Sequence, residues 1–243
     1  MKLLNIDANA KTVKGQKRGY MTAVLYLAPW KSAGVNLCPM AEIAACNVSC
    51  LNTAGRGGIM KRGETSNVIQ QARIERTKQF FENRDAFMHQ LIVEISKAIK
   101  SAERLGLTPV FRLNGTSDIA WEGIVCATDG YPSIFDAFPD VQFYDYTKAP
   151  ASARQGTANI ANYALTFSLS ESLVSRARAI EWICFGRNVA VVFGGTIPAE
   201  FMGRPVINGD ESDLRFLDPK ASIVGLKAKG KARKSDSGFV VRQ

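Results

Sequence analysis

Histidine is the scarcest residue of catalytic interest in this sequence. Only one, His89, occurs among 243 residues. Every serine or cysteine nucleophile that relies on a histidine base would have to use this one side chain. His89 falls within a stretch of helical periodicity, where a partly exposed helix residue is the simpler interpretation. The sequence therefore argues against hydrolases of the Ser-His-Asp and Cys-His types.

Several other signatures are absent. No run approaches the roughly 18 apolar residues that cross a bilayer. Residues 1–7 are too short and too early charged for a secretory leader. The sequence also has no GxxxxGK[ST] loop, no GxGxxG after a strand and no HExxH. We therefore expect a cytoplasmic protein in a reducing setting, with no membrane partner.

Acidic residues are fewer than basic ones. The 22 Asp and Glu residues against 31 Lys and Arg residues give a formal net charge of +9. Such an excess favours polyanionic partners, either nucleic acid or anionic small molecules such as nucleotides. Solvated lysines on loops and edge strands, where they discourage aggregation, explain the same composition. Much of the excess lies near the two ends of the chain, at residues 11–18 and 227–234.

Three of the five cysteines lie close together, as Cys38, Cys46 and Cys50 with the spacing C-x7-C-x3-C. Thiolates are soft ligands for zinc, copper(I) or an iron–sulfur cluster. We predict a metal centre here, with one coordination position left for another residue, water or substrate. The alternatives are buried structural thiols and a disulfide, which an odd number of cysteines disfavours. Cys126 and Cys184 stay unassigned.

Apolar runs, polar run ends and amphipathic stretches alternate along the chain. We predict strands at residues 20–27, 110–113, 139–148, 162–171, 188–195 and 223–228, and helices at residues 65–83, 85–106, 132–138 and 172–185. This alternation is typical of an α/β fold with a largely parallel sheet. We expect a single domain, residues 1–243, that forms a partial (β/α) barrel of about six largely parallel strands. Residues 1–18 should be a flexible lead-in, and residues 220–243 a basic C-terminal β extension.

Polar side chains follow the predicted strands. Parallel strands would bring them to one rim, together with the cysteines. They are Asn114, Ser117, Asp118, Asp145, Lys148, Ser168, Ser170 and Glu171. Such a rim suits a small cofactor with amine, carboxylate and hydroxyl groups, although it does not identify catalytic residues. A desolvated Lys148 would suit Schiff-base chemistry, and an ion pair with Asp145 or Asp118 is the alternative.

A separate acidic group lies near the C-terminus, at Asp210, Glu211, Asp213 and Asp218. Carboxylates of this kind bind magnesium in metal-assisted phosphate chemistry. The spacing does not match a calcium-binding loop. A solvated turn with Arg215 as counter-ion is the simpler interpretation.

Five strings of residues carry a resemblance over nearly the whole length. They are Cys38-Pro39 with Cys46 and Cys50, residues 112–118 (RLNGTSD), residues 143–148 (FYDYTK), residues 209–219, and residues 225–230 (GLKAKG). On these strings the chain resembles the phage gene-product-88 domain family. The resemblance implies a phage origin and a location in the infected host cell, and it implies no activity.

More distantly, the chain is similar to radical S-adenosylmethionine enzymes. In them a cysteine triad after the first barrel strand holds a [4Fe–4S] cluster, whose fourth iron binds the amino and carboxylate groups of S-adenosylmethionine. Cys38, Cys46 and Cys50 follow the first predicted strand in the same way. Residues 112–118 match the segment that contacts the amine of that cofactor. The spacing departs from the C-x3-C-x2-C of that family.

The first interpretation is therefore a phage iron–sulfur protein, a radical S-adenosylmethionine-like enzyme that acts on a nucleotide or nucleic acid. One alternative is a non-enzymatic module that binds nucleic acid or a host protein and carries a structural zinc site. Another is a magnesium-dependent phosphoryl-transfer enzyme that uses Asp210, Asp213 and Asp118. Bound iron with labile sulfide would support the first interpretation. Zinc together with salt-sensitive DNA binding would support the second, and function that is retained without the cysteines would support the third.

Overall fold

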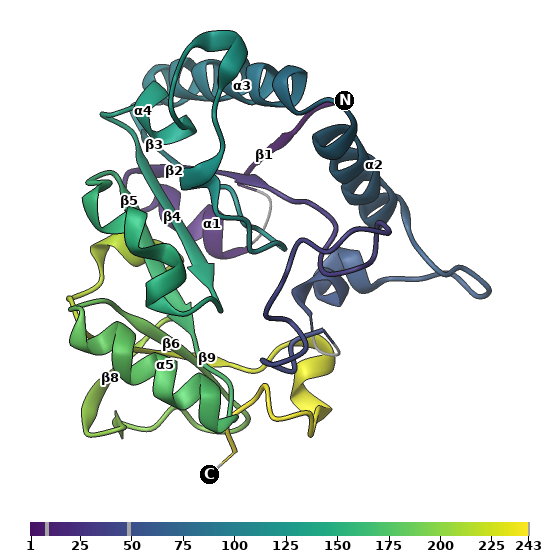
Figure 1. Ribbon diagram of the computed structural model, residues 1–243. Helices are drawn as coiled ribbons and strands as arrows, with labels where there is room; N and C mark the ends of the chain where they lie inside the picture. Colours follow the sequence, from purple (N-terminus) through teal and green to yellow (C-terminus); the bar gives the residue numbers. More distant parts are fainter. Residues whose placement is uncertain (8–9, 48–49, 243) are drawn as a thin grey trace.

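Nine strands form one sheet in the computed structural model, which describes residues 1–7, 10–47 and 50–242 (Figure 1). The strands are β1 (Leu4–Ile6), β2 (Tyr20–Leu25), β3 (Thr108–Arg112), β4 (Gln142–Thr147), β5 (Tyr163–Ser168), β6 (Val189–Phe193), β7 (Glu200–Phe201), β8 (Arg204–Asn208) and β9 (Ile223–Lys227). Their order across the sheet is β1-β2-β3-β4-β5-β6-β9-β8-β7. All neighbours from β2 to β8 in this order pair parallel, whereas β1 and β7 pair antiparallel at the edges.

Five α-helices accompany the sheet within these residues. They are α1 (Ala10–Gln16), α2 (Val68–Glu82), α3 (Arg84–Arg104), α4 (Ile134–Ala137) and α5 (Leu173–Cys184). Polar side chains start two of the long ones: the Asn67 side chain accepts hydrogen bonds from the N–H groups of Ile69 and Gln70, and Ser172 accepts one from Ser175. Such bonds satisfy donors that the start of a helix leaves unpaired. No helix in the described part of the chain is long and apolar enough to cross a bilayer.

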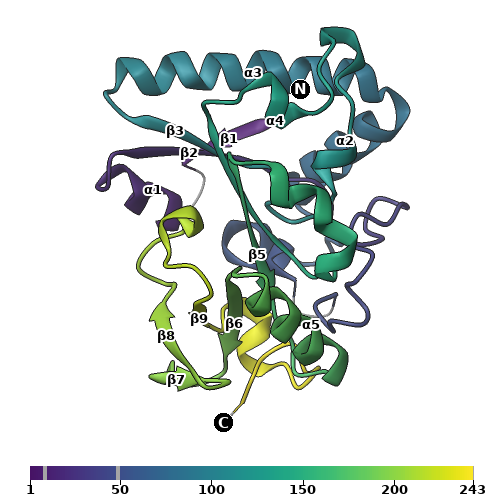
Figure 2. The ribbon, with the colours of Figure 1, turned by 60° about the vertical axis from the view of Figure 1, so that its left-hand side comes forward.

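The two faces of the sheet carry different side chains. Met21, Phe111 and Phe143 belong to the main apolar core, which also contains buried residues of α3, α4 and α5. The alternate positions point the other way, where Val110 and Tyr144 pack with Leu214. Figure 2 shows α3 above the strands β1 to β3 and α1 below them.

The strands β2 to β6 lie side by side in the order in which they occur in the chain. Crossovers between parallel strands are almost always right-handed, so this order sends the connecting segments to one face of the sheet. The carboxyl ends of all these strands then lie along one rim. In Figure 1 the sheet follows an arc, with the segment after β2 and the C-terminal segment on its open side.

The predicted α/β class and the mostly parallel sheet are confirmed, and the strand count was wrong. The sheet has nine strands rather than about six, and it is open, so the predicted partial barrel is not confirmed. The strands β1 and β7 have three and two residues, and β8 is partly exposed along its length. Segments so short or polar carry no clear period-two signal.

The two chain ends also differ from the prediction. Residues 1–18 contain β1 and α1 rather than only a flexible lead-in. The N–H groups of Leu3 and Leu4 donate to the carboxylate of Glu94 on α3, which holds this end against the fold. In the C-terminal extension β9 forms as predicted, whereas the residues after it add only a single bridge to the sheet, between Phe193 and Val241.

Candidate functional site

The three clustered cysteines lie in the loop that follows β2. Tight turns shape this loop: the N–H of Ala41 donates to the carbonyl of Cys38, and the N–H of Cys46 donates to the carbonyl of Ala41. Cys50 then begins the 3-10 helix η1 (Leu51–Thr53). The loop is therefore held by its own backbone hydrogen bonds, and it turns back on itself between the cysteines.

All three cysteines line one cavity of about 110 Å³. The rest of its wall comes from the same loop, at Pro29, Trp30, Ser32, Ala41, Asn47, Asn52 and Thr53. A water molecule occupies about 30 Å³ in the liquid, so the cavity is larger than one small ligand atom requires. The structure thus brings together the three side chains that the sequence indicated as metal ligands.

Two of the sulfur atoms accept backbone hydrogen bonds. The N–H of Trp30 lies 3.3 Å from Cys38 Sγ, and that of Asn52 lies 3.4 Å from Cys50 Sγ. Burial raises the pKa of Cys38 to about 12 and also raises the pKa of Cys46 and Cys50. The thiols are therefore protonated near neutral pH, and a metal that binds them must displace their protons. The two N–H donors favour the thiolate form.

The three thiols share a cavity without forming a ready-made site for a single metal ion. Among the residues that the structure describes, no group of three or more histidine, cysteine or acidic side chains could hold a metal ion. A zinc ion needs each sulfur ligand at about 2.3 Å from one point. In a [4Fe–4S] cluster each thiolate binds a different iron atom, so its sulfur ligands need not meet at a point.

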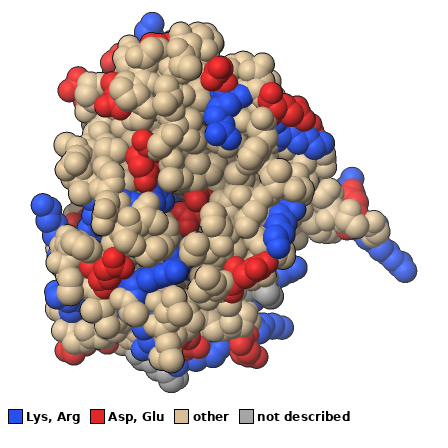
Figure 3. Space-filling model, viewed as in Figure 1, with Lys and Arg blue, Asp and Glu red and all other residues tan. Residues whose placement is uncertain are grey.

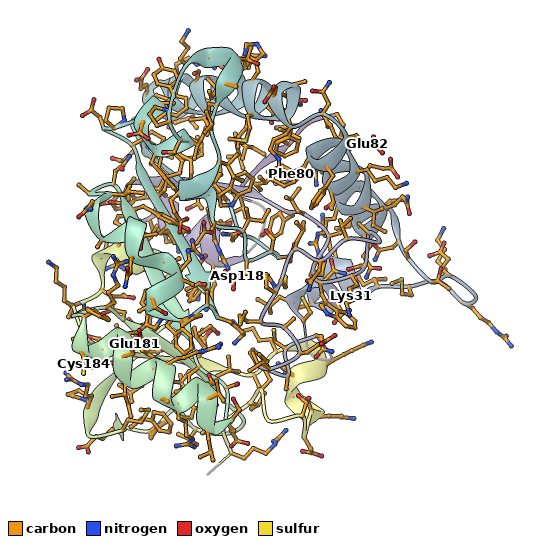
Figure 4. The ribbon with its side chains drawn as sticks, in the orientation of Figure 1. Lys31, Phe80, Glu82, Asp118, Glu181 and Cys184 are labelled. Atoms are coloured by element: carbon orange, nitrogen blue, oxygen red, sulfur yellow. The ribbon has the colours of Figure 1, made fainter. Side chains whose placement is uncertain are left out.

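Asp118, Lys148 and Ser168 lie beside the cysteine cavity. Asp118 raises the pKa of Cys38 and Cys46, and Lys148 lowers that of Cys46, because the groups are close. The N–H of Lys148 donates to Asp118 Oδ2 at 2.9 Å, and its Nζ donates to the carbonyl and the hydroxyl of Ser168 at 2.8 and 3.0 Å. Figure 4 places Asp118 near the centre of the arc, where Figure 3 shows a recess with acidic and basic atoms.

Asn114, Ser117 and Asp145 form a buried layer next to these groups. Asn114 Oδ1 accepts hydrogen bonds from Ser117 Oγ at 2.9 Å and from Trp121 Nε1 at 3.2 Å. The N–H of Asn114 donates to Asp145 Oδ1 at 2.7 Å. Because these atoms are already hydrogen-bonded to one another, we assign the three residues to holding the loop that presents Asp118.

Arg154 is a buried residue of the site that sequence reasoning missed. Its guanidinium binds both carboxylate oxygens of Glu122, at 2.5 and 3.0 Å, and lies 3.4 Å from Asp118 Oδ1. It also donates to the hydroxyl of Tyr163, which in turn donates to Asp145 at 3.2 Å. Arg154 lies in the 3-10 segment η5 (Ala151–Asn159), whose sequence has no periodic pattern that would indicate burial.

The predicted site residues Ser170 and Glu171 lie under the C-terminal segment. The Glu171 carboxylate accepts a hydrogen bond from the N–H of Arg242 at 3.0 Å, and the N–H of Glu171 donates to the carbonyl of Gly238 at 2.7 Å. Ser170 is buried, and its hydroxyl has no partner within the described part of the chain.

The C-terminal segment also reaches the cysteine loop and Lys148. Ser237 Oγ donates to the carbonyl of Ala45 at 3.1 Å, and Lys148 Nζ lies 4.7 Å from the ring centre of Phe239. Burial lowers the pKa of Lys148, as expected for an amine shielded from water. No sequence pattern indicated that residues near the end of the chain would complete the site.

The acidic group near the C-terminus does not form a common site. Asp210 pairs with Lys11 and Lys229, and Asp213 pairs with Arg112. Asp218 lies 3.1 Å from Arg215. Glu211 accepts a hydrogen bond from Asn208, and only Asp218 has the Arg215 counter-ion that the simpler interpretation predicted. This pairing argues against a magnesium site at these residues.

The remaining candidate ligands lie elsewhere. His89 Nδ1 is 2.9 Å from Asp129 Oδ1 on an exposed part of α3. Cys126 is buried in the main core, and Cys184 is exposed at the end of α5. Figure 4 shows Cys184 on the outer side of that helix, away from Asp118.

The buried carboxyl of Asp145 gives a pH-dependent prediction. Burial raises its pKa from 3.8 to about 7. Between these values the folded protein keeps a proton that the unfolded chain releases, so this group lowers the free energy of unfolding as pH rises, by about 1.4 kcal/mol per pH unit at most. We expect Asp145→Asn to gain stability relative to the wild type by about 2–3 kcal/mol between pH 5 and pH 7. Urea unfolding of the wild type and the variant at pH 5 and pH 7 measures this gain. A difference in unfolding free energy between the two proteins that is the same at both pH values would contradict the prediction.

Comparison with known proteins identifies a family. A family model described as Gene product 88 matches residues 1–243. No curated protein and no solved structure shows a significant match. The similarity to radical S-adenosylmethionine enzymes therefore has no support from these comparisons, and it depends on the chain's own residues and strand order.

Proposed function

Because the chain belongs to the phage gene product 88 family over residues 1–243, we propose its function from its own residues. It is an iron–sulfur enzyme of the radical S-adenosylmethionine type that acts on a nucleotide or nucleic acid. The observation that carries the proposal is the cavity shared by Cys38, Cys46 and Cys50. The loop around it follows the first of the consecutive parallel strands, where α/β proteins place their ligands.

Cys38, Cys46 and Cys50 would hold the [4Fe–4S] cluster. The N–H groups that point at Cys38 and Cys50 support this role, since hydrogen bonds to cluster sulfurs tune such centres. When bound, the cluster supplies one-electron chemistry and an iron atom with an open position. The raised thiol pKa values predict that loading releases protons and is favoured at higher pH.

The rim beside the cavity would bind S-adenosylmethionine. Lys148 Nζ has three donors and uses two of them on Ser168, so the third is available to a carboxylate. The carboxylate of Asp118 suits an amino group, and the unpartnered hydroxyl of Ser170 suits a polar group of the cofactor. Arg154 and Asp145 would position these groups without touching the cofactor.

Electron paramagnetic resonance tests the proposal. We expect the reduced, reconstituted protein to show a [4Fe–4S] signal that changes when S-adenosylmethionine is added. Lys148→Gln should keep the cluster and bind the cofactor about 10- to 100-fold more weakly, because a charged hydrogen bond contributes about 1.5–3 kcal/mol. Lys31→Gln, at an exposed lysine of the cysteine loop, is the matched control. A cluster signal that does not respond to the cofactor would contradict the cofactor assignment.

A further inference from the structure

We propose that a strip of basic side chains beside the cysteine cavity binds the phosphate backbone of a nucleic acid. This inference deepens the proposed function and rests on it for the substrate class alone. The strip consists of two groups that are far apart in the chain. Its members are Arg56, Lys61, Arg62, Lys231, Arg233 and Lys234.

The C-terminal group lies next to the segment that carries Arg56, because the C-terminal segment packs on the cysteine loop. The 3-10 helix η7 (Gly230–Lys234) contacts η1, and Gly230 approaches Ala54 so closely that an added Cβ would lie 3.5 Å from it. Ser237 is hydrogen-bonded to Ala45 in the same region. Figure 1 shows η7 beside the segment that follows the cysteines. Arg56 and the C-terminal group therefore lie near the segment that begins at Cys50, and the loop of residues 59–66 extends the strip outward before α2 (Figure 1).

These segments hold most of the net charge of the protein. Residues 51–66 and 227–242 contain nine Lys and Arg residues and two acidic ones, so they contribute +7 of the net +9. Figure 3 shows Lys and Arg atoms along the lower right edge and at the tip of the loop that projects on that side. The charge that the composition revealed is thus concentrated on one side of the candidate site.

The six side chains of the strip are exposed and have no acidic partners among the described residues. Neighbouring basic residues outside the strip differ, since Lys229 pairs with Asp210 and Arg242 with Asp236. Cations of like charge without counter-ions repel one another, and a partner with regularly spaced negative charge removes that repulsion. A phosphate backbone has this regular spacing.

The side chains of the strip also indicate which part of the nucleic acid they contact. No exposed aromatic ring lies in residues 51–66 or 229–234, and proteins that bind unpaired bases stack them on aromatic rings. Lysine and arginine contacts to phosphates fix position on the nucleic acid without reading its sequence. The strip therefore predicts sequence-independent binding, with the backbone held where a nearby base could approach the cavity.

Two triple variants and a control test the strip on the full-length protein. Arg56→Gln/Lys61→Gln/Arg62→Gln changes one group, and Lys231→Gln/Arg233→Gln/Lys234→Gln changes the other. Lys97→Gln/Lys100→Gln/Arg104→Gln removes the same charge from α3, on the far side of the molecule in Figure 1. Binding of a fluorescein-labelled DNA duplex is measured by anisotropy over a series of salt concentrations.

We expect both strip variants to bind the duplex at least about tenfold more weakly. Their plot of log affinity against log salt should lose about 0.9 of slope for each phosphate contact removed, and the α3 variant should match the wild type. The strip is wrong if the strip variants bind as the wild type does, if the α3 variant loses as much affinity, or if polyglutamate competes as well as DNA at equal charge. Iron content is measured on every sample, so that a loss of DNA binding can be distinguished from a loss of the cluster.

Discussion

Cys50→Ser protein should retain almost no iron–sulfur cluster after reconstitution, and Cys38→Ser and Cys46→Ser should behave alike. A serine hydroxyl is a hard donor with a much higher pKa than a thiol, so it replaces a thiolate poorly as an iron ligand. The three cysteines line one cavity and no further cysteine lies there to substitute. Loss of any one thiolate therefore leaves one more iron atom of the cluster without a protein ligand. Iron content and visible absorption measure the effect.

Cys184→Ser is the matched control for this series. Cys184 is a free, exposed cysteine on α5, outside the cavity. The variant should load the wild-type amount of iron and sulfide. If it lost as much as Cys50→Ser, or if Cys50→Ser kept the full cluster, the ligand assignment would be wrong.

Replacing Arg154 should lower the free energy of unfolding much more than replacing an exposed arginine does. Arg154 is 4% exposed, and its guanidinium faces the carboxylates of Glu122 and Asp118. Removing one partner of a buried ion pair leaves an uncompensated charge, which typically costs about 3–5 kcal/mol. We expect Arg154→Met to lower the free energy of unfolding by this amount in urea at pH 7. The methionine fills much of the volume of the arginine stem, so the loss reflects the unpaired charges.

Arg62→Met provides the comparison at an exposed arginine. Arg62 makes no ion pair among the described residues, and surface substitutions of this kind change stability by about 0.5 kcal/mol or less. Equal unfolding midpoints for the two variants would show that the Arg154 network does not stabilise the fold as we describe.

The fold was predictable where one element carries a long, regular pattern. The helical spacing of Phe87, Leu91 and Ile95 indicated α3, and these residues are buried in the core. The apolar run after residue 20 indicated β2. The strands β1 and β7 were missed because two or three residues cannot show a period. Their strand geometry comes from pairing with a neighbour, as when Leu4 pairs with Leu25.

The proximity of several predicted site residues was foreseeable from the sequence, whereas the residues that support them were not. Parallel strand ends brought Asp118, Lys148 and Ser168 together because topology alone places such ends at one rim. Arg154 and Phe239 were missed because their places depend on how an irregular segment folds back over the sheet. Such long-range packing of loops leaves no local pattern in a single sequence.

Metal and sulfide analysis of protein purified without oxygen tests the central claim most directly. The account predicts about four iron atoms and four acid-labile sulfides per chain, as a [4Fe–4S] cluster requires, with broad visible absorption that Cys50→Ser abolishes. Zinc at one equivalent without sulfide, or a colourless protein that takes up no iron on reconstitution, would contradict it.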